Sequence, residues 1–182
     1  LLDGKSLDEW PNIMKENKKS KKIGQVFTPE YLVNNMLDYI GYIGFDIIRK
    51  HIIDNSCGDG AFLKQIVTRY CDESLKAGAS IDSIKQELET YIHGIDIDEK
   101  ACNQCITKLN IVAKKFGIEN VNWDLYNQDS LAVNKFNSKM DFVIGNPPYV
   151  RVHNLEASYD EVKQYKFAIG GMTDLYLVFF EL

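Results

Sequence analysis

Apolar and polar residues follow one another along this chain in two different patterns. Short apolar runs predict buried strands, and longer stretches with an apolar residue at every third or fourth position predict helices. The patterns place strands at 51–54, 91–96, 121–126 and 140–144, and helices at 28–41, 61–75, 81–88, 99–116 and 173–182. Because apolar strands that alternate with helices form a parallel sheet covered on both faces, the chain is predicted to have an α/β fold.

The expected helix at 28–41 begins with three residues that favour a helix start. Thr28 can cap the helix with its hydroxyl, Pro29 suits the first helical position, and Glu30 places an acid in the first turn. We therefore expect Thr28 to be the capping residue.

The length and composition of the chain limit what it can be. At 182 residues and 45% hydrophobic, it can bury a core as one domain with a small appendage. It contains no apolar stretch as long as a membrane span and no signal-peptide pattern, so we expect a cytoplasmic protein without membrane contact. The four cysteines indicate reduced thiols, and Cys102 and Cys105 supply only half of a zinc site, so we expect no metal.

Basic residues concentrate near the N-terminus, although the net charge of −5 argues against a surface that grips nucleic acid everywhere. Residues 15–22 contain five lysines, and residues 6–17 predict a short helical entry broken by Pro11. We interpret residues 1–22 as a helical and basic segment, which is either a solvated arm or a phosphate contact. Residues 23–182 form the main domain.

The tetrapeptide Asn146-Pro147-Pro148-Tyr149 follows the fourth expected strand. Two consecutive prolines remove two backbone donors and stiffen the turn, so the Asn146 amide oxygen and the Pro147 carbonyl are available to accept hydrogen bonds from one planar NH₂ group. Tyr149 offers a flat face on which a ring can stack. An ordinary turn is the alternative, because Asn-Pro dipeptides are common turn starters.

The other expected strands also end in residues suited to a ligand. After the first strand, Gly58 and Gly60 permit a tight turn before a helix N-terminus, without the spacing of a dinucleotide fingerprint or a P-loop. The second strand ends at Asp96, which can accept both hydroxyls of a ribose, and the third runs into 128–130, where Asp129 can accept from an adenine amine. Since ligands bind beyond the carboxyl ends of parallel strands, these segments predict a nucleoside site.

In chain order, these segments resemble the S-adenosylmethionine-dependent DNA methyltransferases of restriction–modification systems that act on adenine N6. The stretch 24–29 resembles their N-terminal motif, which holds the methionine moiety, and 54–60 is similar to their glycine-rich loop, with Asn55 where proline is more usual. The resemblance implies cofactor contacts from Phe27, Thr28, Pro29, Asp54, Cys57, Gly58, Gly60, Asp96, Ile97, Asp129, Ser130 and Asn146, and catalysis by Asn146, Pro147, Pro148 and Tyr149. It also implies a Rossmann-like S-adenosylmethionine-dependent methyltransferase fold, an incomplete parallel sheet flanked by helices.

The resemblance further implies a function, which is methyl transfer from S-adenosylmethionine to a flipped adenine in double-stranded DNA. A restriction or specificity subunit is a further expected partner. Because the family is expected to have seven strands and only about four are accounted for, we expect residues 23–182 to be a C-terminally truncated catalytic domain. Such a domain binds the cofactor but is inactive alone, and the DNA-recognition region lies outside it.

Three alternatives stay open. Two of them arise because other enzymes carry the same tetrapeptide. Some methylate guanine N2 in RNA and others a glutamine amide in protein, and each of these substrates presents a planar NH₂ group. A third alternative is a non-catalytic module that only binds the cofactor.

The three histidines, His51, His93 and His153, are scattered along the chain. A histidine in a strand is more often a satisfied structural residue than a catalyst, so these are weaker candidates than the tetrapeptide. His153 and Arg151 follow the tetrapeptide and can contact DNA, but the polarity of an exposed loop explains them equally well.

Overall fold

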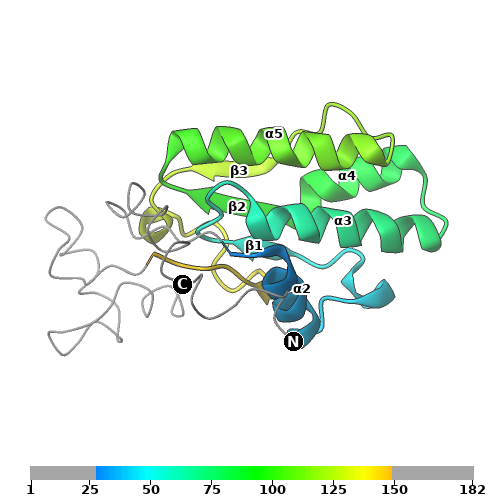
Figure 1. Cartoon of the computed structure of the whole chain (residues 1–182), viewed down its shortest axis with the longest axis horizontal. Helices are drawn as coiled ribbons and strands as arrows, with labels where there is room; N and C mark the ends of the chain where they lie inside the picture. Colours follow the sequence, from blue (N-terminus) through cyan, green and yellow to red (C-terminus); the bar gives the residue numbers. More distant parts are fainter. Residues whose placement is uncertain (1–27, 149–182) are drawn as a thin grey trace, which may run out of the picture.

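The computed structural model describes residues 28–148, which form a four-stranded parallel sheet with helices packed against it (Figure 1). The strands are β1 (Ile52–Asp54), β2 (Ile92–Asp96), β3 (Asp124–Asn127) and β4 (Phe142–Val143). The helices are α2 (Glu30–Tyr39), α3 (Ala61–Lys76), α4 (Ile81–Tyr91) and α5 (Glu99–Lys115), with short 3₁₀ helices η3 (Gly44–Ile47) and η4 (Ser130–Ala132). The elements predicted at 6–17 and 173–182 lie outside the described residues, so the boundary at residue 22 stays a prediction.

The strands are ordered β3-β2-β1-β4, and every neighbouring pair is parallel. The chain builds β1, β2 and β3 outward in one direction and then returns to place β4 on the other side of β1. In sheets of this kind, ligands bind at the carboxyl ends of the strands where the order reverses. The α/β prediction is therefore confirmed, and the topology places a ligand site beside the ends of β1 and β4.

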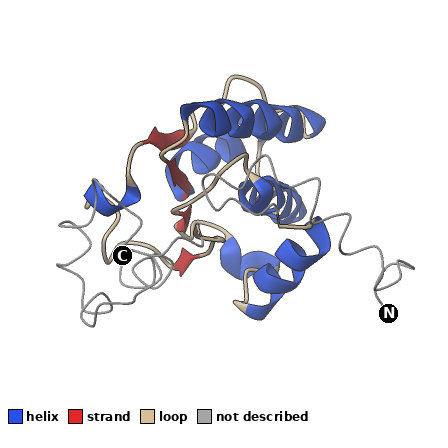
Figure 2. Ribbon diagram, turned by 60° about the vertical axis from the view of Figure 1, so that its left-hand side comes forward, coloured by secondary structure: helices blue, strands red, loops and turns tan. Residues whose placement is uncertain are grey.

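The two faces of the sheet are covered differently. Figure 2 shows the long helices gathered on one side of the strands, and there Ile52 and Ile92 join the main apolar core. Because successive strand residues point to opposite faces, Ile53 and Ile95 face the other way, where they pack against Phe136. Within residues 28–148, long helices thus cover only one face, and none is long and apolar enough to cross a membrane.

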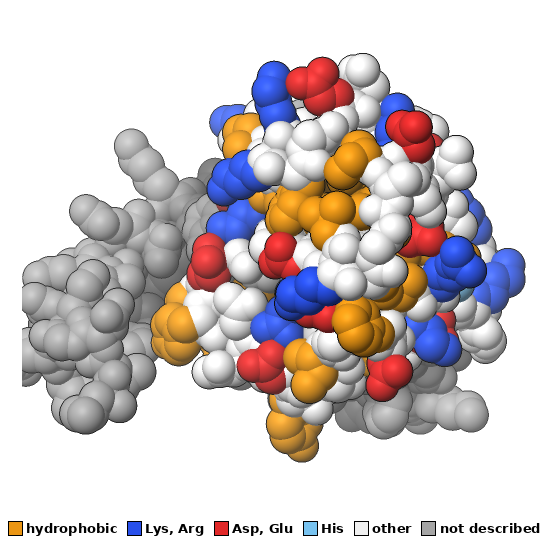
Figure 3. Space-filling model, turned by 90° about the vertical axis from the view of Figure 1, so that its right-hand side faces the viewer, with side chains coloured by type: hydrophobic (Ala, Val, Ile, Leu, Met, Phe, Trp, Pro, Cys, Tyr) orange, Lys and Arg blue, Asp and Glu red, His pale blue; other side chains and the backbone are white. Residues whose placement is uncertain are grey.

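Charged side chains of both signs are interspersed with hydrophobic ones on the face shown in Figure 3. No continuous basic area is visible on this face.

Thr28 does not cap α2, so the predicted capping role is wrong. The helix begins at Glu30, its N-cap residue is Pro29, and no side chain makes a capping hydrogen bond. The Thr28 Oγ1 instead accepts a hydrogen bond of 3.2 Å from the Asn146 Nδ2. The helix starts one residue later than a threonine cap requires. The Thr28 hydroxyl is therefore available for a contact with Asn146, a residue distant in the chain.

Two strands are shorter than their apolar runs predict. β3 begins at Asp124, although Val121 is buried, because a loop residue can fill the core without pairing in a sheet. β4 has two residues, and within residues 28–148 it pairs only with β1, which itself has three. The length of an apolar run therefore reports burial, while the partner strand limits how far the ladder extends.

Arg69 of α3 holds α2 against the rest of the domain. Its guanidinium donates to the Asp38 Oδ1 at 2.6 Å, to the Asn34 Oδ1 and backbone carbonyl at 3.0 Å, and to the Tyr42 carbonyl at 3.1 Å. Its side chain is 19% exposed, so solvent screens these contacts only in part. This clasp fixes the position of the segment that carries Thr28.

We expect Arg69→Met to lower the free energy of unfolding by about 2–3 kcal/mol, because it keeps the apolar stem but removes the donors from four acceptors. Urea denaturation measures the change. The control is Lys76→Met, which removes an exposed ion pair within one helix and is expected to leave the free energy of unfolding close to that of the wild type. If the two variants lost the same free energy of unfolding, the contacts of Arg69 would not stabilise the position of α2.

Candidate functional site

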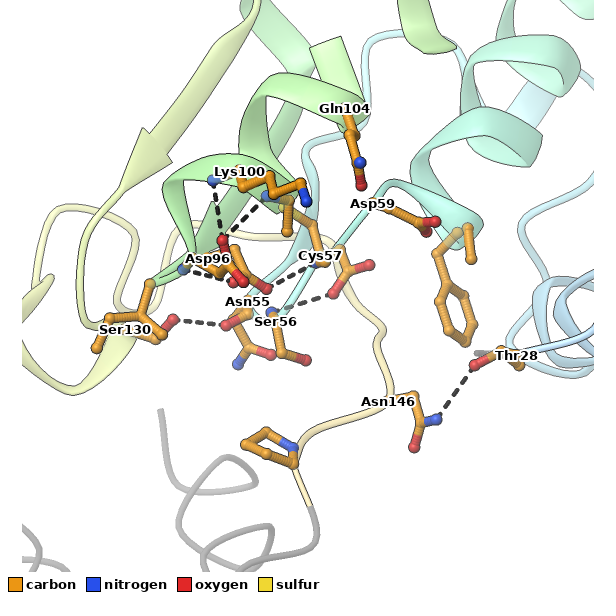
Figure 4. Close-up of a pocket in the computed structure, with 18 residues that line it drawn as sticks. Thr28, Asn55, Ser56, Cys57, Asp59, Asp96, Lys100, Gln104, Ser130 and Asn146 are labelled. Carbon is orange, nitrogen blue, oxygen red and sulfur yellow. Dashed lines mark hydrogen bonds between the residues drawn. The ribbon is translucent and has the colours of Figure 1, made fainter. Parts of the chain in front are cut away.

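A cleft of about 320 Å³ opens at the carboxyl edge of the sheet, close to the ends of β1, β2 and β4 (Figure 4). Its walls come from the segments that follow these strands, from the first turns of α3 and α5, and from the residues before α2. The lining residues are Thr28, Asp54, Asn55, Ser56, Cys57, Gly58, Asp59, Ala61, Phe62, Asp96, Ile97, Asp98, Lys100, Ala101, Gln104, Ser130, Asn146 and Pro148. The fold therefore gathers segments from most of the described chain around one cavity.

Most of the site residues predicted from the sequence line this cleft. They are Thr28, Asp54, Cys57, Gly58, Asp96, Ile97, Ser130, Asn146 and Pro148. Four others, Pro29, Gly60, Asp129 and Pro147, are neighbours of lining residues in the chain but do not line it themselves. Phe27, Tyr149, Arg151 and His153 lie outside the described residues.

Asp129 has a local structural role. Its carboxylate accepts the N–H of Leu131 at 3.0 Å, and it is the N-cap residue of η4. The neighbouring Ser130 lines the cleft, and its hydroxyl donates to the carbonyl of Asn55 at 2.5 Å. The assignment of Asp129 to the cofactor's adenine amine stays a prediction.

Residues in the first turns of α3 and α5 were missed. Lys100 and Gln104 of α5 line the cleft from positions four residues apart, which lie on one face of a helix. Ala61 and Phe62 of α3 do the same beside the glycine-rich loop. A helix that follows a strand starts at the carboxyl edge of the sheet, so this rule applied to both helices would have found them.

The glycine-rich loop is held against the end of β2. The N–H of Gly58 donates to the Asp96 Oδ2 at 2.7 Å. Gly58 and Gly60 have φ values of +50° and +88°, in the left-handed region that glycine tolerates. A Cβ at Gly60 would lie 2.7 Å from the Cys105 Sγ, so α5 packs directly on the loop. The two glycines therefore allow the backbone to form the floor of the cleft.

Asp96 has the acceptors that a ribose diol requires. Its Oδ1 accepts the N–H of Asp98 at 2.9 Å and its Oδ2 that of Gly58, which leaves further lone pairs on both oxygens. Beside it, Ile97 is 67% exposed at the rim of the cleft. A carboxylate next to an exposed apolar side chain fits the sugar and the flat ring of a nucleoside.

A buried acid lies between the first strand and the segment after β4. Asp54 is 1% exposed, and its Oδ1 accepts the N–H of Ser56 at 3.1 Å. Burial raises the pKa of Asp54 to about 7, and the nearby Asp96 carboxylate also raises it. A Cβ at Gly145 would lie 2.6 Å from this Oδ1, so the backbone leading to Asn146 passes directly over the acid.

An unsatisfied hydroxyl lies at the same place. Within the described part of the chain, the buried Ser56 Oγ has no hydrogen-bond partner. Burying a polar group without a partner is costly, and such a group in a cleft is satisfied when a polar ligand binds. Together with the Asp54 carboxyl, this hydroxyl fits a ligand that carries positive charge and hydrogen-bond donors.

The turn formed by residues 146–148, called here the Asn-Pro-Pro turn, faces the cleft across from Asp96 (Figure 4). The Asn146 amide group is turned toward Thr28, and its Nδ2 donates to the Thr28 Oγ1 at 3.2 Å. The site therefore combines acceptors for a nucleoside on one side with a rigid carboxamide on the other.

No group of three or more His, Cys, Asp or Glu side chains that could hold a metal ion occurs within residues 28–148. All four cysteines are buried, and none forms a disulfide.

Residues 9–175 match the family model described as N-6 DNA Methylase. Type II methyltransferase M.BstVI from Geobacillus stearothermophilus is 30% identical over 176 residues, which cover 87% of this chain and 30% of that protein. Type II methyltransferase M.XhoI from Xanthomonas vasicola is 25% identical over 165 residues, with the same coverages. The chain thus spans about 30% of the length of these curated relatives.

Solved structures show the same fold. A protein from Listeria monocytogenes described as a class I S-adenosylmethionine-dependent methyltransferase aligns with a TM-score of 0.56 and 18% identity, over 100% of this chain and 50% of that one. The Type ISP restriction-modification enzyme LlaGI, in complex with a DNA substrate mimic, aligns with a TM-score of 0.59 and 18% identity, over 97% and 18%. The predicted Rossmann-like fold of the S-adenosylmethionine-dependent methyltransferases is confirmed.

Proposed function

The chain belongs to the N-6 DNA methylase family, and from this premise we propose that the whole protein transfers a methyl group from S-adenosylmethionine to N6 of adenine in double-stranded DNA. One observation carries the proposal. The Asn-Pro-Pro turn lies across a single cleft from Asp96, and Ile97 lines the same cleft. A nucleoside cofactor and a planar amine can therefore meet in one cavity.

The residues of the cleft fit the cofactor at both of its ends. Asp96 accepts the ribose hydroxyls, Ile97 packs against the adenine, and the backbone of the glycine-rich loop allows close approach. The buried Asp54 and Ser56 suit the cationic amino-acid end, because they supply a carboxyl and an unsatisfied hydroxyl. When bound, S-adenosylmethionine supplies a methyl group on a positively charged sulfur.

The Asn-Pro-Pro turn acts on the target amine. Adenine N6 is a poor nucleophile because its lone pair is delocalised into the ring. The Asn146 side-chain oxygen and the Pro147 carbonyl accept its two N–H groups, which favours a pyramidal nitrogen and stabilises the positive charge that develops during transfer. The turn also aligns the nitrogen for in-line displacement, and the proton leaves afterwards. No activated base is needed beforehand.

The target adenine must swing out of the DNA double helix to reach this cleft. A base within a duplex cannot contact the turn, so we propose that the adenine is flipped out and stacks on Tyr149. The structure of LlaGI with a DNA substrate mimic supports DNA as the substrate class. We further propose that DNA is recognised by a region outside this chain. A restriction or specificity subunit is a further proposed partner, and the cytoplasm is the proposed place of action.

Methyl transfer from radiolabelled S-adenosylmethionine to DNA, RNA and protein tests the proposal. With the whole protein, we expect the label in N6-methyldeoxyadenosine. With the 182-residue chain alone, we expect cofactor binding by calorimetry but no transfer. If the label appeared in RNA guanine or in a protein glutamine, that molecule and not DNA would be the substrate. If the whole protein bound the cofactor without transferring a methyl group, it would be a cofactor-binding module.

We expect Asp96→Asn to weaken S-adenosylmethionine binding by about 30- to 100-fold, because hydrogen bonds to a charged acceptor contribute about 1.5–3 kcal/mol each. Calorimetry with the 182-residue chain measures the affinity. Asp82→Asn, an exposed acid on α4, is the matched control and is expected to bind as the wild type does. Unchanged affinity in Asp96→Asn would remove this residue from the cofactor site.

A further inference from the structure

We propose that Thr28 is a positioning residue that holds the Asn146 carboxamide in the orientation required for methyl transfer. The inference rests on the proposed function, because this orientation matters only if Asn146 accepts a hydrogen bond from the target amine. It gives Thr28 a role other than the contact with the methionine moiety that the family resemblance implies.

The contact joins two segments that are 118 positions apart in the chain. The Asn146 Nδ2 donates to the Thr28 Oγ1 at 3.2 Å, and both residues line the cleft. The Thr28 hydroxyl does not cap α2, since no side chain makes a capping bond at the start of that helix. Thr28 precedes Pro29 and Glu30, as a capping threonine does, but its hydroxyl contacts the Asn-Pro-Pro turn instead.

In the observed contact, the nitrogen end of the carboxamide faces Thr28. A carboxamide has an acceptor at its oxygen and donors at its nitrogen, and rotation about its last bond exchanges the two. An amine requires the acceptor, whereas an NH₂ group presented to it would be repelled. Because Thr28 accepts from the nitrogen, the oxygen lies on the side turned away from Thr28 (Figure 4).

Thr28 lies just before α2, a helix that side-chain contacts join to α3. The Lys64 Nζ of α3 donates to the Glu30 Oε2 at 2.7 Å, two residues after Thr28. Arg69 joins the same two helices further along. Because α3 starts directly after the glycine-rich loop, these contacts join the helix that follows Thr28 to the helix that follows that loop.

The two roles for Thr28 make different kinetic predictions. Loss of a cofactor contact weakens binding of S-adenosylmethionine and leaves the rate at saturation unchanged. Loss of a positioning contact lowers the rate at saturating cofactor and leaves the affinity unchanged. A variant of equal size without the hydroxyl separates the two.

The test compares Thr28→Val with Thr28→Ser in the whole protein, with DNA and saturating S-adenosylmethionine. We expect kcat to fall by about 10- to 100-fold in the valine variant, the range that misplacement of a reacting group produces, with a cofactor Kd within about threefold of the wild type. The serine variant keeps the hydroxyl and is expected to retain kcat within about threefold. Thr90→Val on α4, whose hydroxyl donates within its own helix, is the control.

The outcomes separate this inference from the proposed function. If the wild type does not methylate DNA, the proposed function fails and the positioning role fails with it. If the wild type methylates adenine and Thr28→Val keeps its kcat, or loses only cofactor affinity, the positioning role is wrong and the proposed function stands. A loss in kcat that serine does not restore also overturns it.

Discussion

Asn146→Ala is expected to lower methyl transfer by about 10³-fold while leaving the affinity for S-adenosylmethionine within a few-fold. The variant removes the side-chain acceptor that stabilises charge on the amine in the transition state, and loss of one such group costs about 10²- to 10³-fold. The Pro147 carbonyl remains but cannot hold the amine alone. Initial rates with saturating cofactor and DNA measure the change, and calorimetry measures the affinity.

Asn122→Ala is the matched control, because this asparagine is exposed in the loop before β3 and does not line the cleft. It is expected to transfer methyl groups at the rate of the wild type. If Asn146→Ala did so as well, the Asn-Pro-Pro turn would have no part in catalysis. If it lost cofactor binding to the same extent as activity, Asn146 would be a binding residue alone.

Asp54→Asn is expected to make the protein more stable at alkaline pH. Burial raises the pKa of Asp54 from 3.8 to about 7, so between these values the folded protein holds a proton that the unfolded chain has released. Stability from this group is therefore fully present below about pH 3.8 and is lost as pH rises through 7, by about 1.4 kcal/mol per pH unit. Asparagine is neutral throughout and keeps an acceptor for the N–H of Ser56.

The free energy of unfolding of the variant minus that of the wild type is expected to rise by about 3 kcal/mol between pH 5 and pH 8. Urea denaturation at both values measures it. Burial lowers the pKa of His93, which acts in the opposite direction, but this contribution cancels in the difference. Asp72→Asn, an exposed acid on α3, serves as control, and a difference for Asp54→Asn that does not change with pH would contradict the buried acid.

The sequence predicted the fold well because burial controls it. The apolar runs that end at Asp54 and Asp96 are the central strands of the sheet, where every residue is buried and must be apolar or satisfied. The acids that end these runs line the cleft, as expected from the rule for parallel sheets. Local patterns therefore sufficed wherever one strand alone determined the position of a residue.

The parts that the sequence did not predict depend on contacts between distant segments. Thr28 has the pattern of a cap, but its hydroxyl meets Asn146. Lys100 and Gln104 could be placed at the carboxyl edge of the sheet from the sequence, but that they share a cleft with Asp54 depends on β2 lying next to β1. Short-range patterns report the elements but not which of them become neighbours.

The strand histidines make structural contacts in the described part of the chain. His93 is buried and is hydrogen-bonded on both ring nitrogens, to the Asp124 Oδ2 at 2.6 Å and to the His51 Nδ1 at 2.9 Å. This network lies toward the amino ends of the strands, away from the cleft. Its exact partners were not predictable, because the register of β2 against β3 brings His93 beside Asp124.

A crystal structure of the chain with S-adenosylhomocysteine bound is the most direct test of the proposed site. We predict that the ribose hydroxyls lie on the Asp96 carboxylate and that the sulfur faces the Asn-Pro-Pro turn across the cleft. A ligand bound elsewhere, or an Asn146 side chain directed away from the bound sulfur, would contradict the central claim.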